Sequence, residues 1–170
     1  MRPLVILGSA RPDGEPRRAV DIAFPAGSAD LLILPDFIIG GYDYKHRNTT
    51  DAFSSIAEAM TSVDRIVFAT PVYWYAMSAP LKFFFDRLTD LTENLKSQGK
   101  ALASKQVWVV VAVTEETLPE GFEVPFRRTS EYFDMNYRGT AYLYTGTDAD
   151  LRAQTAAAMT AFGQSITDGR

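Results

Sequence analysis

Short apolar segments alternate with amphipathic segments along the chain. Five runs rich in Val, Ile, Leu and aromatic residues each predict a strand, at residues 4–8, 31–35, 65–70, 106–113 and 139–144. Between these runs, apolar residues recur at helical spacing near residues 16–24, 51–61, 78–96 and 121–135, and again after Thr147. Such alternation is typical of a parallel sheet with helices on both faces. We therefore expect one doubly wound α/β domain over residues 1–170.

Local signals refine the ends of these elements. Pro71 is expected to end the third strand, because proline cannot donate to a sheet ladder. Ser78 is a suitable N-cap for the long helix, whose first turn tolerates Pro80. Thr147 and Asp150 stand in capping-box spacing and predict the start of the last helix.

Composition excludes several classes of function. The 17 basic and 21 acidic residues give a formal charge of −4, so neither nucleic acid nor an anionic membrane surface is a natural partner. The absence of cysteine excludes disulfides, thiol nucleophiles and cysteine-ligated metal centres, and one histidine excludes a multi-histidine metal site. The first apolar run is too short for a signal peptide, and no run reaches membrane-spanning length. The default expectation is a cytoplasmic protein.

The loop after the first strand has the chemistry of a phosphate site. Ser9 offers a hydroxyl and Arg11 a guanidinium, and Gly14, Glu15 and Pro16 lead into a helix start with unpaired N–H groups. The loop matches neither the Walker pattern nor GxGxxG. Taken alone, such a Gly/Pro/Ser-rich turn is more often a simple connection.

Two further loops follow strands three and four, at the sheet edge where ligands of such folds bind. The first holds Pro71, Val72, Tyr73, Trp74, Tyr75 and Ala76, and a flat ligand could lie against its aromatic rings. Packing under a helix or in a subunit contact is the competing interpretation of these rings. The second loop, residues 113–119, contributes Thr114 as a candidate and carries two adjacent glutamates.

Residues 7–11 and 69–82, with the continuation through Leu88, resemble the flavodoxin-like superfamily of NAD(P)H-dependent FMN reductases and quinone reductases. The resemblance implies a flavodoxin-like sheet of five parallel strands in the order 2-1-3-4-5, with FMN at the strand ends. It places the FMN phosphate near Ser9 and Arg11, with the backbone as far as Pro16. It places the isoalloxazine ring at residues 71–76.

The chain departs from the superfamily pattern at two places. Relatives commonly carry Gly-Asn-Ser or Gly-Asn-Thr where this chain has Gly14, Glu15 and Pro16, so a carboxylate replaces neutral polar groups. Many relatives carry Gly-Asn where this chain has Tyr75 and Ala76, which adds bulk beside the ring. Loosely held FMN is the expected consequence of the first departure.

The implied reaction passes a hydride from NADPH or NADH through FMN to a small acceptor such as a quinone, a flavin or another reducible aromatic. No catalytic acid or base and no metal ligand is assigned. Lys45, His46 and Arg47 could meet the extra phosphate of NADPH, although a solvated charged loop is the commoner role of such a run. The resemblance also implies a homo-oligomer, either a dimer or a tetramer. A flavodoxin-type electron carrier and a flavin-free binding module remain alternatives.

Overall fold

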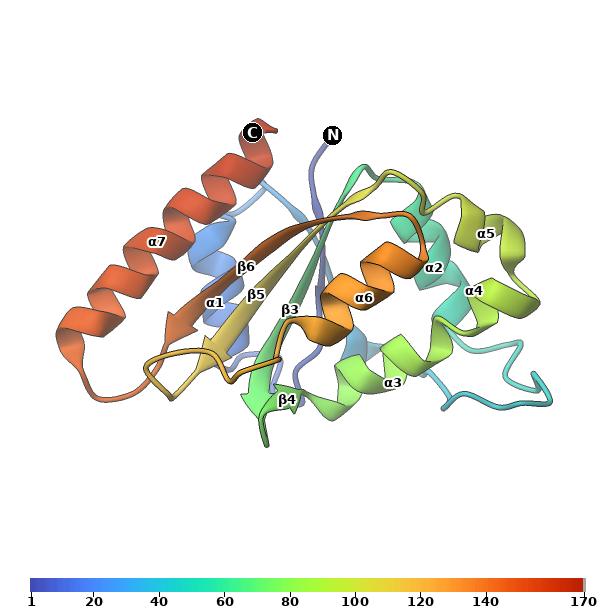
Figure 1. The fold of residues 1–170 in the computed structure, drawn as a ribbon, viewed down its shortest axis with the longest axis horizontal. Helices are drawn as coiled ribbons and strands as arrows, with labels where there is room; N and C mark the ends of the chain where they lie inside the picture. Colours follow the sequence, from blue (N-terminus) through green and yellow to red (C-terminus); the bar gives the residue numbers. More distant parts are fainter. Residues whose placement is uncertain (170) are drawn as a thin grey trace.

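The computed structural model describes residues 1–169 as a parallel sheet between two layers of helices (Figure 1). The parallel strands lie in the order β2-β1-β3-β5-β6, which confirms the predicted order of five strands. Their bounds are β1 (Leu4–Leu7), β2 (Asp30–Ile33), β3 (Arg65–Tyr73), β5 (Gln106–Val113) and β6 (Asn136–Tyr144). A short strand, β4 (Ala76–Met77), turns back antiparallel on the end of β3.

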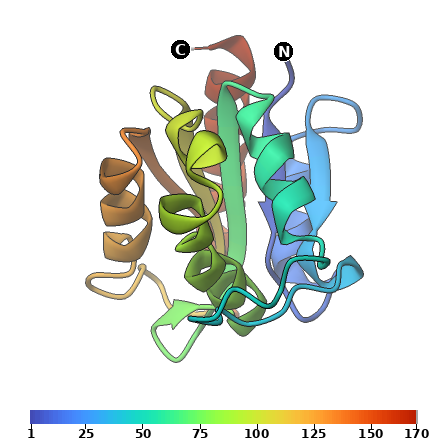
Figure 2. The same ribbon diagram turned by 90° about the vertical axis from the view of Figure 1, so that its right-hand side faces the viewer.

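Helices cover both faces of the sheet (Figures 1 and 2). One face carries α1 (Glu15–Ala23) and α7 (Ala149–Asp168), which pack on each other and on the strands. The other face carries α2 (Phe53–Thr61), α3 (Ala79–Arg87), α4 (Asp90–Glu93), α5 (Lys96–Lys100) and α6 (Val124–Tyr132). A 3-10 turn, η1 (Leu34–Asp36), follows β2.

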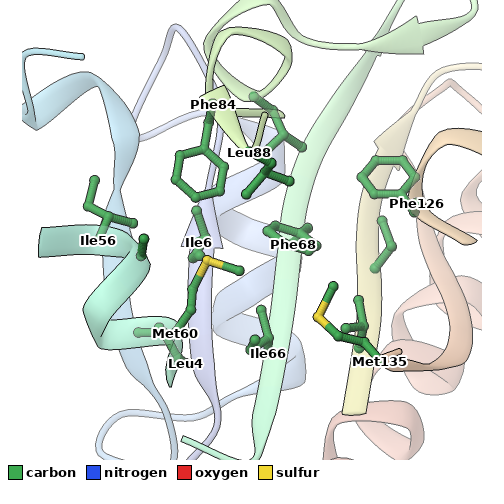
Figure 3. Close-up of a cluster of buried hydrophobic side chains, with 14 of the residues drawn as sticks. Leu4, Ile6, Ile56, Met60, Ile66, Phe68, Phe84, Leu88, Phe126 and Met135 are labelled. Carbon is green, nitrogen blue, oxygen red and sulfur yellow. The ribbon is translucent and has the colours of Figure 1, made fainter. Parts of the chain in front are cut away.

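Each face of the sheet has its own hydrophobic core. Alternate residues of β1 divide between them: Leu4 and Ile6 face the layer of α2 to α6, whereas Val5 and Leu7 face α1 and α7. Figure 3 shows the first core, where Phe68 of β3 lies among side chains of the helix layer and of β1. Because both faces are covered, the central strands β1, β3 and β5 are apolar at nearly every position, which explains why their sequences form apolar runs.

The predicted long helix over residues 78–96 is wrong in length, because it is divided into α3, α4 and α5. Thr89, Thr92 and Asn94 have low helix propensity, and the Thr92 hydroxyl donates to the Thr89 carbonyl. The backbone of Gly99 then approaches that of Leu91 so closely that a Cβ there would lie 2.2 Å from the Leu91 carbonyl oxygen. The chain therefore folds back on itself where the apolar periodicity suggests a continuous helix.

Other predicted ends also differ from the structure: the second strand ends at Ile33, and the helix predicted at residues 121–135 is confined to α6 (Val124–Tyr132). Three further differences have a local reason. β3 continues through Pro71 to Tyr73, because β1 ends opposite Ala69 and the proline has a parallel partner, Ala112, only in β5. β6 begins at Asn136, three residues before its expected start, because a bulge interrupts its register between Tyr137 and Gly139. The N-cap of α7 is Asp148, which accepts a hydrogen bond from the Leu151 N–H, so the capping-box prediction based on Thr147 is wrong by one residue.

Candidate functional site

The carboxyl ends of β1, β3, β5 and β6 meet at one edge of the sheet, at the bottom of Figure 1. All three loops selected from the sequence lie at this edge, which is where parallel sheets of this kind bind ligands.

The first loop leaves β1 along a fixed path. The Gly8 N–H donates to the Ala69 carbonyl at 2.8 Å, and the Ser78 hydroxyl donates to the Gly8 carbonyl. The Thr70 hydroxyl accepts from the Ser78 N–H at 3.0 Å, so the ends of β1 and β3 and the start of α3 are joined. Gly8 is required here, because a Cβ would lie 2.5 Å from the Cβ of Leu81. The loop is therefore positioned by groups that are themselves buried.

Within this loop, Ser9 shapes the backbone. Its buried hydroxyl donates to the Arg11 carbonyl at 2.9 Å and accepts from the Arg11 N–H at 3.2 Å. The N–H groups of Ala10 and Asp13 have no hydrogen-bond partner among residues 1–169, and no side chain caps α1. Free N–H groups beside the N-terminus of a nine-residue helix form a site suited to an anion.

The charged groups of the loop differ in their partners. Glu15 forms an ion pair with Arg18 at 3.2 Å, and Arg17 forms one with Asp21 at 2.9 Å. Arg11 is exposed and has no carboxylate within 4 Å in the described part of the chain. Arg11 is therefore the arginine of this loop that is free to meet an incoming anion, and the charge of Glu15 is compensated by Arg18.

The second loop is the tip of a two-residue hairpin between β3 and β4. Tyr73 pairs with Ala76, and Trp74 and Tyr75 form the turn with positive φ values of 48° and 65°. These values are those of a type I′ turn, which normally takes Asn and Gly. The Trp74 side chain is 93% exposed and Tyr75 is 73% exposed, so core packing does not explain them. The packing interpretation of these rings within this chain is wrong.

Two adjoining cavities lie between the loops. The first has a volume of about 180 Å³ and is lined by nine of the twelve predicted site residues. Two residues that were not predicted, Ala112 and Thr145, also line it. The full lining is Ser9, Arg11, Gly14, Glu15, Pro16, Pro71, Val72, Tyr73, Ala112, Thr114 and Thr145. The second, of about 190 Å³, shares Val72 and Thr114 with it and adds Trp74, Tyr75, Val113, Glu115 and Pro119. Ala76 is exposed in β4 and lines neither cavity. Together the cavities fall in the size range of small-molecule sites.

The topology of the sheet explains why the two unpredicted residues, Ala112 and Thr145, line the first cavity. Ala112 lies at the end of β5, and Thr145 directly follows β6 and donates its N–H to the Val113 carbonyl at 2.8 Å. Both are at carboxyl ends of parallel strands, as the general rule requires. A search of every strand end, including the last, would have found them.

The segment of residues 37–52 is held against α3 by the buried Arg87. Its Nε donates to Asp90 at 2.7 Å, its Nη1 pairs with Asp51 and donates to the Gly40 carbonyl at 3.0 Å, and its Nη2 donates to the Asn48 carbonyl at 3.1 Å. Burial raises the pKa of Asp51, but hydrogen bonds from Arg87 and from the Gly40 and Phe53 N–H groups outweigh this, so the pKa lies below its ordinary value.

The basic residues of this segment are largely paired. Arg47 binds Asp43 at 2.6 Å, and His46 lies between Asp90 at 3.2 Å and Glu93 at 2.8 Å. Tyr42 donates to Glu93, and neither Tyr42 nor Tyr44 lines either cavity. These contacts favour a structural role for the charged run over binding of a nucleotide phosphate. Within residues 1–169, no group of His, Asp and Glu side chains has the arrangement of a metal site.

Comparison with known proteins identifies the relatives of this chain. Residues 1–150 match the family model described as NADPH-dependent FMN reductase. The chain belongs to this family. A Bacillus subtilis protein, YwqN, described as an NAD(P)H-dependent FMN-containing oxidoreductase, is 25% identical over 149 residues, which is 82% of each chain. The expected resemblance and the assignment to the oxidoreductases are therefore confirmed.

Solved structures of other proteins share the fold. The Trp repressor binding protein from Bacillus subtilis is 20% identical, covers 95% of this chain with 97% of its own, and gives a TM-score of 0.75. The general stress protein 14 from Treponema denticola, solved in complex with FMN, is 18% identical, with coverages of 98% and 99% and a TM-score of 0.68. At these identities the likeness supports the flavodoxin-like fold alone. None of the helices within residues 1–169 has the length and apolar character needed to cross a bilayer.

Proposed function

We propose that this protein is an FMN-dependent oxidoreductase that takes electrons from NADH or NADPH and passes them to a small, flat acceptor such as a quinone, a flavin or another reducible aromatic. One observation carries the proposal. An anion-binding loop with a free arginine and a pair of exposed aromatic rings stand at opposite ends of two cavities that share Val72 and Thr114. That arrangement matches a ligand with a phosphate at one end and a flat ring at the other.

The residues present fit FMN. The free N–H groups of Ala10 and Asp13, together with Arg11, are donors for the phosphate. Pro71, Val72 and Tyr73 lie between this loop and the hairpin tip, and would hold the ring end. When bound, FMN supplies the hydride chemistry that the side chains of this chain lack.

The protein's own groups act by placement. The hydrogen bonds among Gly8, Thr70 and Ser78 fix the loop that receives the phosphate, and the I′ turn presents the backbone and rings of the hairpin to the flat part of the ligand. Thr114, Glu115 and Pro119 of loop 114–119 line the second cavity on the side opposite the hairpin tip. We assign no residue as an acid or base.

An anaerobic flavin titration tests the proposal. We expect the apoprotein to bind FMN more tightly than FAD, because the loop that holds Ser9, Gly14 and Pro16 lines the phosphate end of the cavity and would contact an adenylate extension. Addition of NADH or NADPH should then bleach the bound flavin, and an acceptor should restore its colour. Binding of FMN without bleaching would indicate an electron carrier. No binding of any flavin would indicate a flavin-free module.

Replacement of Arg11 by alanine should weaken FMN binding by about 1.5–3 kcal/mol, the range for hydrogen bonds to a charged group. Riboflavin, which lacks the phosphate, should bind the variant and the parent equally. The matched control is Arg17→Ala, because Arg17 is already paired with Asp21 and does not line the cavity. An equal loss of riboflavin affinity would place Arg11 outside the phosphate site.

Trp74 and Tyr75 at the hairpin tip should lower the stability of the fold while providing contacts to the ligand. We expect the double variant Trp74→Asn/Tyr75→Gly to raise the free energy of unfolding by about 1–2 kcal/mol, because it relieves left-handed strain at two residues that pack on little else. The same variant should bind FMN less tightly, since two rings are lost from the ring end of the site. Urea unfolding and flavin titration measure the two effects. A variant that is no more stable would show that the turn is unstrained.

We also propose a homo-oligomer. In the aromatic run of α3, Phe84 is fully buried and Phe85 packs on the core. Phe83 is 54% exposed, so its ring is available for a contact with another subunit. Exposed Tyr44 and Ile38 belong to the segment that Arg87 fastens to the same helix layer. Light scattering at micromolar concentration distinguishes a dimer or tetramer from a monomer. A cytoplasmic location and the absence of a nucleic-acid partner remain predictions.

A further inference from the structure

Two larger cavities lie among the helices on one face of the sheet. The third cavity, of about 430 Å³, is lined by residues of α4 and α5 and by the end of α6, and the fourth, of about 340 Å³, by residues of α3, α4 and α6. Figures 1 and 2 both show α6 beside α4 and α5. Thr92, Tyr132 and Phe133 line both cavities, so the two form one space, which we call the α4–α6 groove.

This groove is separate from the proposed FMN site. Ala103 and Asp134 of its lining precede β5 and β6, so the third cavity lies near the amino ends of these strands, opposite the carboxyl edge. The groove shares no lining residue with the first or second cavity. Its two cavities fall in the volume range of small-molecule sites.

The floor of the α4–α6 groove is apolar. Leu91 lines the third cavity, Leu88 lines the fourth and Phe133 lines both, and all three side chains are buried. The Tyr132 ring stands beside them, 70% exposed, with its centre 5.3 Å from that of the Phe133 ring. An apolar body lying on this floor would cover hydrophobic surface and one face of an exposed ring.

Contacts between neighbouring segments fix the walls of the third cavity. The backbone of Gly99 packs so closely on Leu91 that α5 is held against α4. The Ser104 N–H donates to the Asp134 carbonyl at 2.8 Å, which joins the segment after α5 to the segment after α6. The groove is therefore formed by groups of the chain itself, and a ligand would need to order little of it.

Unpaired positive charge gathers at the α5 end of the groove. Lys96 and Lys100 both line the third cavity, and their i,i+4 spacing places them on the same face of α5. Neither ammonium group has an ion pair or a hydrogen bond within residues 1–169, whereas Lys82 pairs with Asp86. Asp134 is the one carboxylate in the lining of the groove, and it pairs with neither lysine.

The helix itself does not explain this arrangement. Like charges at i,i+4 repel each other, and Lys96 is the first residue of α5, where a helix disfavours a positive charge. An anion between the two ammonium groups would relieve the repulsion. At the other end of the groove, Arg128 is already paired with Glu131 at 2.8 Å. The α5 end is therefore the end that attracts an anionic group.

We propose that the α4–α6 groove binds an anionic amphiphile of the fatty-acid type, with its carboxylate between Lys96 and Lys100 and its alkyl chain along the apolar floor. Unpaired positive charge at one end, followed by an apolar floor through two cavities, fits a long apolar body with a single charged head. The proposal does not depend on the oxidoreductase function, because the groove and the FMN site share no residue.

Calorimetric titration with dodecanoate, kept below its micelle-forming concentration, tests the proposal. We expect Lys96→Gln/Lys100→Gln to weaken binding about tenfold, because two exposed charge pairs of about threefold each are lost. Both lysines are exposed, so this variant should keep its fold, which circular dichroism checks. The matched control is Lys45→Gln/Lys82→Gln, which removes the same charge at two lysines outside the groove and should change the affinity by less than about twofold.

Two comparisons use the unchanged protein. Dodecyltrimethylammonium has the same alkyl chain and the opposite charge, and it should bind at least about tenfold more weakly than dodecanoate. In the series octanoate, decanoate and dodecanoate, affinity should rise about twofold for each added methylene, which corresponds to burial of about half of its surface in an open groove.

The outcomes decide between this groove and other sites. Dodecanoate affinity that saturating FMN leaves unchanged, and that falls only in the Lys96/Lys100 variant, supports the proposal. Equal affinities of the two double variants overturn it, and so does displacement of dodecanoate by FMN, which would place the anion in the phosphate loop. If the protein binds no dodecanoate and Tyr132→Lys dissociates an oligomer in light scattering, a second copy covers the groove and the proposal fails. A protein that binds dodecanoate in the groove but no flavin would overturn the oxidoreductase proposal alone.

Discussion

Replacement of Arg87 by alanine should lower the free energy of unfolding by about 3–5 kcal/mol, the cost of removing one partner from a buried ion pair. Arg87 is 2% exposed, and its loss would leave the carboxylates of Asp51 and Asp90 buried without their cation. The Gly40 and Asn48 carbonyls would lose their donor, and the face of Phe53 would lose the guanidinium 4.7 Å from its centre. Urea unfolding followed by circular dichroism measures the effect.

The matched control for this experiment is Lys82→Ala on the same helix. Lys82 also pairs with a carboxylate, Asp86, but the pair is solvent-exposed, so less than about 1 kcal/mol should be lost. Equal losses in the two variants would show that the Arg87 cluster contributes no more than a surface pair. Because Arg87 fastens residues 40–51, its variant should also become sensitive to proteolysis in that segment before the rest of the chain.

The same cluster predicts how stability depends on pH. The pKa of Asp51 is lowered in the folded state, so its contribution is complete above the pKa of the unfolded chain, about 3.9, and is lost as pH falls through the lower folded value. Unfolding free energies measured from pH 7 down to pH 3 should therefore fall below about pH 4. Asp51→Asn should be less stable at neutral pH and should show a smaller loss in the acid range. Parallel curves for the two proteins would contradict this assignment.

Replacement of Gly8 by alanine should damage both the fold and the site. A Cβ at this position would lie 2.5 Å from the Leu81 Cβ and 3.0 Å from the Leu81 nitrogen and Cα, so either β1 or the start of α3 must move. Overpacking of this kind costs about 1–3 kcal/mol. FMN affinity should fall by about tenfold or more, because the displaced loop misaligns donors whose hydrogen bonds depend steeply on geometry.

Gly27→Ala separates these two effects. Gly27 has a φ of +85° with open space around it, so alanine there is strained by its backbone alone. The residue follows the C-terminal end of α1, whereas the phosphate loop precedes the N-terminal end of that helix. This control should lose about 1 kcal/mol of stability and retain its FMN affinity. Loss of FMN affinity in both variants would mean that affinity follows general stability rather than the position of the loop.

How much the sequence could predict depended on whether the signal was local. The strand predicted at residues 106–113 and the Ser78 cap depend on neighbouring residues, and the structure has both as expected. The strand predicted at residues 4–8 is present and ends one residue earlier, at Leu7. The loop between β3 and β4 was also recognisable, yet its hairpin was not, since Trp74 and Tyr75 replace the Asn and Gly that usually mark a type I′ turn.

The features that escaped prediction depend on contacts between distant parts of the chain. Arg87 looks like an ordinary basic residue at the end of a helix, and its partners Asp51 and Asn48 stand 36 and 39 positions earlier. Thr145 and Ala112 lie at the ends of strands that the sequence predicts, but that both reach the first cavity follows from the pairing of β5 with β6. The division of the long helix likewise follows from the close approach of Gly99 to Leu91.

The buried hydrogen bonds that join Gly8, Thr70 and Ser78 are made entirely by groups of the chain itself. A loop held in this way gives up little conformational entropy when it binds a ligand, so we expect more of the contact energy to appear as affinity. We also expect removal of the flavin to leave the fold intact, so that one flavin can be exchanged for another without unfolding.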